Sequence, residues 1–531
     1  AAYNTAVGYH ALEDNTTGTA NVALGVQTLT NVTTGDQNTG LGYQAGFSLT
    51  TAHFSTLAGY QAGYSATSES YVTAFGHQAL YSHTSGNYPT AVGYQALYSN
   101  TTGPDCTAVG LESAEYNTTG SGTTAIGRTA LRNNTTGNYS TAVGAFALED
   151  QTTPQLNTAL GYEAGANITT GGVNTIVGAR ALKFGSTGQS NTAVGYNALG
   201  QTTTGNYNVA VGRDAMAANT VVANCVAIGY EAIYANTAGT HLTAVGHQAL
   251  RNNTSGSSNT AFGITTMYSN TTGYQNVAMG RSAMFDNTTG GNNVAIGYNA
   301  LADNTTGDNN VAIGKDAMRY NTTNGAAVAI GLQALEDANG GGENIGIGNA
   351  AGADLTTGDN NICIGALSGQ FGGGGKLTTG NRNILIGTGA IPSSNSDSNS
   401  LIITCPTSRT STTGRGGGTG LISVSGGSGS IYQGNNSSSW ATTSDRRLKK
   451  NIVDSSIGLA EINQLQVRNF EYRTGDEITE LDPSTAIDKS GVQVGVIAQE
   501  IQAILPDCVK EETTGALTVD PDNLTWHLVK A

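Results

Sequence analysis

The chain has 531 residues, of which 74 are glycine and only 11% are charged, and its formal net charge is −15. Because no basic stripe exists to neutralise a phosphate backbone, nucleic acid is not expected as a partner. The sequence has neither an apolar run long enough to cross a bilayer nor a signal peptide, so membrane insertion is not expected either.

A glycine recurs every seventeen residues from Gly8 to Gly365 without a change of register, which makes 22 copies of one unit. A typical copy, residues 293–307, reads Asn-Val-Ala-Ile-Gly-Tyr-Asn-Ala-Leu-Ala-Asp-Asn-Thr-Thr-Gly. So strict a period indicates stacked, identical rungs, not a globular core. The unit is too short for a strand-helix-strand crossover, which needs about 30 residues, so we predict short strands joined by turns. The Asn-Thr-Thr-Gly segment is typical of such a turn.

Two adjacent apolar columns precede the repeat glycine and point to opposite faces of the predicted strand. The position two before the glycine is Ala in 17 of the 22 copies, and the next position is apolar in all 22. A second small-then-large pair follows the glycine, as in Ala198-Leu199. A thin coil has one inside, so apolar residues on both faces indicate that one face lines the coil and the other is buried against a second copy. Small residues would suit the interior and aliphatic residues the interface, but the reverse assignment stays open.

Other columns predict ladders along the coil axis. Asn occupies the position four before the glycine in 13 of the 22 copies, and stacked asparagines can form a side-chain hydrogen-bond ladder. Aromatic or His side chains follow many repeat glycines, and we favour a self-stacking column that stiffens the fibre over a column that stacks on sugars. The irregular stretch from Phe47 to Tyr71 lacks the usual turn and is a candidate for an outward bulge.

The cysteines show no metal-ligand spacing and are interpreted as small, buried apolar residues. No metal and no cofactor is therefore expected. The five are Cys106, Cys225, Cys363, Cys405 and Cys508.

The fold class is predicted as mainly β, with three parts. Residues 1–369 form a parallel β-roll or β-helix fibre of seventeen-residue rungs. Residues 370–443 form a Gly/Ser-rich β neck, with strands expected at 401–404, 421–424 and 430–433. Residues 444–531 form a small α+β domain, because 24 of these 88 residues are charged against 35 of the 443 before them.

Hydrophobic periodicity divides the last part into helices and strands. Helices are expected at 457–465, at 499–505 before Pro506, and at 523–530. Strands are expected at 467–472 and 492–497.

Two motifs of this last part occur in a fixed order. They are Ser-Asp-Arg-Arg-Leu-Lys-Lys-Asn-Ile at 444–452 and Val-Gly-Val-Ile-Ala-Gln-Glu at 494–500. Together they resemble the C-terminal intramolecular chaperone of endosialidases and of other phage tail fibres and spikes. The resemblance implies that three copies of the domain template a trimeric β-fibre and are then released by self-cleavage before the serine. The repeats resemble, more loosely, the β-roll heads of trimeric autotransporter adhesins.

The resemblance also assigns a catalytic dyad, with Ser444 as nucleophile and Lys449 as its base. Cleavage would fall between Thr443 and Ser444. A lysine can accept the serine proton only where desolvation or neighbouring cations lower its pKa, and basic side chains surround Lys449 in the sequence.

The favoured function is a structural and adhesive tail fibre of a bacteriophage virion, assembled in the host cytoplasm. Its expected partners are two further copies of itself in a homotrimer, other virion tail proteins and a host cell-surface receptor, for which a glycan is one candidate. Its enzymology would be at most that of a self-cleaving serine autoprotease. The alternatives are a polysaccharide-degrading phage spike, which would need paired carboxylates on a groove, and a bacterial surface adhesin. Ice binding is a further alternative, and it would need a flat face of regularly spaced threonines.

Overall fold

The computed structural model describes residues 2–370, 376–392, 394–404, 412–413, 420–424, 431–432, 455–480, 487, 491–511 and 515–530. The chain divides into two compact units, Ala1–Ser438 and Ser439–Ala531. The more detailed division at residues 369 and 443 stays a prediction.

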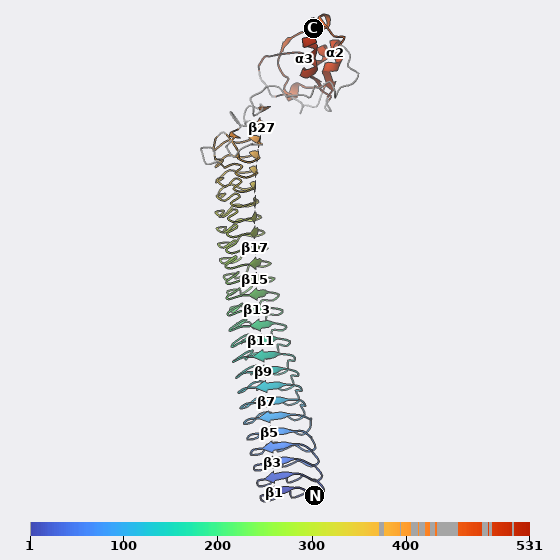
Figure 1. Ribbon diagram of the computed structural model, residues 1–531, viewed down its shortest axis with the longest axis vertical. Helices are drawn as coiled ribbons and strands as arrows, with labels where there is room; N and C mark the ends of the chain where they lie inside the picture. Colours follow the sequence, from blue (N-terminus) through green and yellow to red (C-terminus); the bar gives the residue numbers. More distant parts are fainter. Residues whose placement is uncertain are drawn as a thin grey trace. The chain divides into compact units, whose positions relative to one another are not determined.

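The first unit is a parallel β-solenoid, which confirms the predicted fold class (Figure 1). Each repeat supplies one strand of three residues, and this strand pairs in parallel with the strand seventeen residues further on, as Ala295 pairs with Ala312. The strands are β1 (Thr5–Val7), β2 (Val22–Leu24), β3 (Thr39–Leu41), β4 (Thr56–Ala58), β5 (Thr73–Phe75), β6 (Thr90–Val92), β7 (Thr107–Val109), β8 (Thr124–Ile126), β9 (Thr141–Val143), β10 (Thr158–Leu160), β11 (Thr175–Val177), β12 (Thr192–Val194), β13 (Val209–Val211), β14 (Val226–Ile228), β15 (Thr243–Val245), β16 (Thr260–Phe262), β17 (Val277–Met279), β18 (Val294–Ile296), β19 (Val311–Ile313), β20 (Val328–Ile330), β21 (Ile345–Ile347), β22 (Ile362–Ile364) and β23 (Ile384–Ile386).

The stack continues past the break in the repeat. Asn383 donates to Asn361 although the two residues are 22 positions apart, so β23 takes its place after an insertion in the chain. β23 pairs in parallel with β25 (Leu401–Thr404), which pairs antiparallel with β27 (Gly420–Val424) and so leads to β28 (Ile431–Tyr432). The three strands predicted for the neck are thus present. The short strands β24 (Ala390–Ile391) and β26 (Thr412–Thr413) pair beside them.

Two constraints require glycine at the repeat position: its backbone dihedral angle φ and the closeness of the next rung. Gly195 has a φ of 129°, where side chains are strongly disfavoured. A Cβ atom added to it would lie 2.6 Å from the carbonyl oxygen of Gly212 in the next rung. Both constraints recur at the other repeat glycines, so a side chain at this position would collide with the backbone of the next rung throughout the solenoid.

The small-then-large pair after the repeat glycine does not place its two side chains on opposite faces. Ala198 and Leu199 are both fully buried, although adjacent residues of a strand would face opposite sides. Leu199 adopts a φ of 53°, which turns the chain so that both side chains point inward. That backbone costs about 1–2 kcal/mol, and burial of a leucine side chain returns about 1.5–3 kcal/mol. Only the strand columns therefore place apolar residues on both faces.

Small residues and an asparagine ladder fill the rest of the interior. From β2 to β23 the middle residue of each solenoid strand is buried, as for Ala193 between its neighbours, whereas Ala6 of the first strand is exposed. In the predicted ladder, the backbone N–H of Asn191 donates to Oδ1 of Asn174 at 2.9 Å, and Nδ2 of Asn191 donates to the carbonyl of Gly205 at 2.9 Å. Where consecutive copies carry this asparagine, backbone and side chain of one rung are thereby bonded to the neighbouring rungs.

The turn asparagines form a second ladder that the sequence reasoning missed. Nδ2 of Asn270 donates to Oδ1 of Asn253 at 2.7 Å, and Nδ2 of Asn287 donates to Oδ1 of Asn270 at 2.7 Å. The same Nδ2 of Asn270 also donates to the carbonyl of Gly273 within its own turn, at 3.2 Å. The turn residue thus bonds its own backbone, as predicted, and the next rung as well.

The second unit is a small α+β domain. Its core consists of the fully buried residues Ile501, Leu505 and Cys508, with partly buried aliphatic side chains packed around them. The predicted helices and strands are present, each within a few residues of its expected bounds, and a hairpin of two strands was missed. The elements are α1 (Leu459–Ile462), β29 (Arg468–Phe470), η2 (Gly475–Glu477), β30 (Gln493–Gly495), α2 (Ala498–Ile504), η4 (Pro506–Cys508), β31 (Val509–Glu511), β32 (Leu517–Val519) and α3 (Pro521–Lys530). Among the helices that the structure describes, none is long and apolar enough to cross a membrane.

Candidate functional site

An apolar stripe runs along the outward face of the solenoid strands. The middle residue of each strand faces the interior, so the first and third residues point outward. The third residue is apolar in every solenoid strand and is exposed or half-buried: Leu160 is 50% exposed, Ile228 39% and Phe262 54%, whereas Val194 is half-buried. The assignment that the sequence left open is therefore decided, with the small column inside the coil and the aliphatic column outside.

The stripe becomes wider toward the end of the solenoid. From β17 to β23 the first strand residue is also aliphatic, so each strand presents two apolar side chains to the outside. A contiguous apolar patch of more than a few hundred Å² is rare on a monomeric protein and marks an interaction surface. These first residues are Val277, Val294, Val311, Val328, Ile345, Ile362 and Ile384.

The aromatic column that follows the repeat glycine stacks on itself in two runs of rungs, from Tyr43 to Tyr94 and from Tyr230 to His247, which confirms the predicted self-stacking for part of the column. The ring centroids of Tyr43 and Tyr60 lie 5.3 Å apart, those of Tyr60 and His77 4.9 Å, and those of His77 and Tyr94 5.2 Å, all with nearly parallel planes. Each ring therefore covers the face of the next one. For rings inside such a run only the edges remain for a ligand, whereas a sugar stacks on a ring face, so the stacked runs support stiffening of the coil.

Two further aromatic ladders lie in the same rungs. One runs from Phe47 through Tyr64, Tyr81 and Tyr98, and its centroids are 5.1–5.3 Å apart. The other connects Phe54, Tyr71 and Tyr88. The signal was present in the sequence, because the members of each ladder recur at the repeat spacing.

The outward bulge expected between Phe47 and Tyr71 is wrong. Strand β4 of this stretch pairs in register with both β3 and β5. Leu49 and Ala66 occupy the place of the turn asparagine and are fully buried. Apolar packing thus replaces the polar ladder there, and the rung keeps its shape without the usual turn sequence.

The second family-like motif, at 494–500, spans the end of β30 and the start of α2. Glu500 accepts two hydrogen bonds from Arg468 on β29, from Nε at 3.1 Å and from Nη2 at 2.9 Å. This bidentate pair connects the first turn of α2 to strand β29. Sequence reasoning had assigned no role to Glu500.

The predicted dyad residues Ser444 and Lys449, and the cleavage position after Thr443, lie outside the described residues. The assignment of nucleophile, base and cleaved bond therefore stays a prediction.

The described cysteines of the solenoid are free thiols. Cys106, Cys225 and Cys363 are fully buried, which confirms their interpretation as small core residues. Burial raises the pKa of the Cys363 thiol to about 12, so it stays protonated and unreactive at neutral pH. Cys405 lies outside the described residues.

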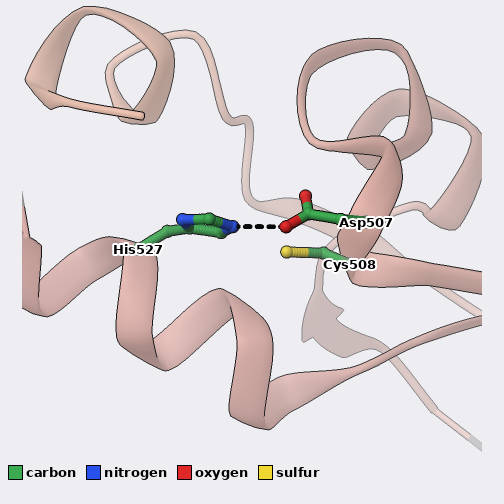
Figure 2. Close-up of side chains that lie close together, drawn as sticks. All are labelled: Asp507, Cys508 and His527. Carbon is green, nitrogen blue, oxygen red and sulfur yellow. Dashed lines mark hydrogen bonds and ion pairs between the residues drawn. The ribbon is translucent and has the colours of Figure 1, made fainter. Parts of the chain in front are cut away.

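The fifth cysteine has different neighbours. Asp507, Cys508 and His527 bring one carboxylate oxygen, one sulfur and one ring nitrogen within 4.8 Å of one another. Figure 2 shows Nε2 of His527 and Sγ of Cys508 converging on the side of the Asp507 carboxylate, with Nε2 at 2.8 Å from Oδ2. The spacing between cysteines could not reveal this cluster, because only one of its three residues is a cysteine and the other two are an aspartate and a histidine.

Comparison with protein families supports the resemblance carried by the two motifs. Residues 444–510 match the model of the family described as chaperone of endosialidase, a match that covers only a small part of the chain. No curated protein and no solved structure matches the sequence or the fold. A long parallel β-solenoid followed by a segment of this family fits a tail fibre or spike with a C-terminal chaperone.

Proposed function

We propose that this chain forms the shaft of a homotrimeric bacteriophage tail fibre and that its C-terminal domain directs trimer assembly. One observation carries the proposal: the solenoid has an apolar stripe along its strand face, and a match to the chaperone family begins further along the same chain, after the neck strands. The role of such a shaft is mainly structural. It contributes to adhesion because the tail attaches to a host receptor through the fibre.

Three copies packed about a common axis would cover the stripe. The outward residues at positions such as Leu160 and Phe262 would then meet their counterparts and leave water. The widening of the stripe from β17 onward places the most extensive apolar contact near the C-terminal end of the solenoid. Trimerisation would therefore be strongest where a C-terminal template brings the chains together.

The repeat also explains why a template is needed. Successive rungs present nearly identical outward faces, so three chains could pair in any register shifted by seventeen residues. Only a feature outside the repeat can align them. A globular domain that trimerises first would set the register, and the rungs would then add one after another from that end.

Release of the template would follow from the dyad proposed at Ser444 and Lys449. The hydroxyl oxygen of Ser444 would attack the carbonyl carbon of Thr443 while Lys449 takes the hydroxyl proton. The peptide nitrogen leaves as an amine after protonation, and water then hydrolyses the resulting ester. The shaft would end at Thr443 and remain trimeric.

The remaining expectations extend the same proposal. Other virion tail proteins would bind one end of the shaft. The virion that carries the fibre would contact a receptor on the host cell surface. The stacked rings of the solenoid expose edges and do not favour a sugar, so the receptor class is not assigned to them.

Removal of residues 444–531 from the gene tests the assembly role. The full chain should give a single trimeric species in light scattering, and the truncated chain should give aggregates or a mixture of masses. Homogeneous, soluble trimers of the truncated chain would contradict the template role. A monomeric full chain would contradict the trimeric shaft.

A further inference from the structure

We propose that Asp507, Cys508 and His527 form a binding site for one Zn²⁺ ion that fastens helix α3 to the 3₁₀ turn η4. This site goes beyond the assembly role, because nothing in the shaft or in the self-cleavage step requires a metal.

The three donors come from two elements that are already held together. His527 lies on α3, whereas Asp507 and Cys508 end η4. The backbone N–H of Asp520 donates to the carbonyl of Cys508 at 2.7 Å, and Nδ2 of Asn523 donates to the carbonyl of Asp507 at 2.9 Å. The backbones that carry the ligands are thus fixed before a metal arrives, which reduces the entropy cost of binding.

The spacing of the donor atoms suits a tetrahedral ion after a small adjustment. Ligands at typical zinc distances lie roughly 3.3–3.8 Å apart, so donors now within 4.8 Å of one another must approach by about 1 Å. The Nε2–Oδ2 separation of 2.8 Å must open by a few tenths of an ångström. The side chain of Asp507 is 57% exposed, so solvent reaches the cluster and a water molecule can complete the coordination.

The donor set selects the metal. A thiolate, an imidazole and a carboxylate together are typical of Zn²⁺, whereas Mg²⁺ and Ca²⁺ prefer oxygen ligands alone. On binding, the sulfur–hydrogen bond of Cys508 breaks, its proton leaves to solvent, and a sulfur–zinc bond forms. His527 binds as the neutral ring through Nε2, so its hydrogen bond to Asp507 is replaced by one metal bond to each residue.

The position of the site suggests its purpose. The family match ends at residue 510, and α3 lies beyond it at Pro521–Lys530. A zinc ion would couple this outlying helix to the matched domain. Among the described residues of the domain, three side chains are fully buried in its core, and a small core gains most from an added cross-link.

Cobalt provides a direct probe of the thiolate ligand. The full chain, carrying Ser444→Ala so that it stays whole whether or not it can cleave itself, is stripped with a chelator and titrated with Co²⁺. We expect one Co²⁺ per chain with a thiolate-to-cobalt charge-transfer absorption band, and displacement of the band by Zn²⁺. Because Cys508 also packs in the core, Asp507→Asn and His527→Gln are the sharper variants, and each should weaken binding at least about tenfold.

Matched controls use the other thiols. Cys363→Ser and Cys405→Ser should keep the band and the affinity, whereas Cys508→Ser should abolish the band. A chain that shows no charge-transfer band with one equivalent of Co²⁺ would overturn the site. So would a band that survives Cys508→Ser, or an affinity that His527→Gln leaves unchanged. None of these outcomes depends on trimer formation or on cleavage.

Discussion

A single oxygen of Asn276, its Oδ1, accepts two hydrogen bonds from Asn293 in the next rung, from the backbone N–H at 2.9 Å and from Nδ2 at 3.2 Å. Both residues are fully buried. Water cannot replace a lost partner at this depth. The backbone N–H of Asn293 therefore depends on the side-chain oxygen of Asn276 as its hydrogen-bond acceptor.

Asn276→Ala should therefore destabilise the solenoid. The N–H of Asn293 would lose its acceptor and stay buried, which costs about 1–3 kcal/mol. Chemical denaturation of the variant should show the loss as a lower midpoint. Asn87→Ala is the matched control, because Asn87 is exposed, and its free energy of unfolding should stay within about 0.5 kcal/mol of the wild type. Equal midpoints for both variants would contradict the ladder.

Gly195→Ala should have a larger effect than an ordinary glycine replacement. The φ of 129° costs about 1–3 kcal/mol for a residue with a side chain, and the overlap with the carbonyl of Gly212 adds to this cost. Gly342→Ala serves as the control, because the nearest atom to its added Cβ lies 3.4 Å away. Thermal unfolding should separate the two variants clearly. Similar melting temperatures would mean that the rungs can separate locally at low cost.

His83→Asn should stabilise the chain, and most at low pH. His83 occupies the turn-asparagine column, and within the described part of the chain its Nδ1 has no hydrogen-bond partner. Burial lowers the pKa of His83, although the Gly86 carbonyl opposes the shift. As the pH falls through about 6.5, the unfolded chain takes up a proton that the folded imidazole resists, so wild-type stability decreases.

The asparagine variant has no such group, and its Oδ1 can accept from Nδ2 of Asn100 in the next rung, as Oδ1 of Asn253 accepts from Asn270. Its melting temperature should exceed that of the wild type at about pH 8 and by more at about pH 5. A gain that does not grow as the pH falls would show that titration of His83 plays no part.

Leu160→Asp should disrupt assembly without unfolding a single solenoid. Leu160 is 50% exposed in one chain, so the fold tolerates a carboxylate there, but three such charges would be buried together in a trimer. Light scattering should show loss of the trimer. Thr170→Asp, an exposed turn position of the same rung, should remain trimeric. A trimeric, equally stable Leu160→Asp would place the interface elsewhere.

Ser444→Ala and Lys449→Ala should each yield a full-length chain that still trimerises, because the template acts through its surface. The wild type should release a C-terminal piece that begins at Ser444, visible on a denaturing gel and identified by N-terminal sequencing. Cleavage that persists in Ser444→Ala would contradict the nucleophile. A wild-type chain that never cleaves would retain its template as a permanent part of the fibre.

The repeat made most of the solenoid predictable from sequence. The column of residues such as Ala193 has one character in nearly every copy, so its burial follows from the geometry of a narrow coil. The inward direction of Leu199 was not predictable in the same way. It depends on a left-handed backbone that leucine disfavours, and only the hydrogen bonds and packing of the assembled coil stabilise it.

The C-terminal unit was predictable only in part. Periodicity located the helices and strands, but a pair such as Arg468 and Glu500 joins segments that lie far apart in the sequence. The same holds for Cys508 and His527, whose proximity depends on how α3 folds back onto η4. Tertiary contacts of this kind leave no spacing pattern for a single sequence to reveal.

The register of the strands has an evolutionary consequence. Thr175 pairs with Thr192, and Thr192 pairs with Val209, so removal of residues 192–208 would let Thr175 meet Val209 in the same way. The coil would shorten by about 4.8 Å and every remaining rung would keep equivalent neighbours. Unequal recombination between near-identical stretches of the gene could therefore set the length of the shaft in whole steps, as a copy number, while the C-terminal domain stays untouched.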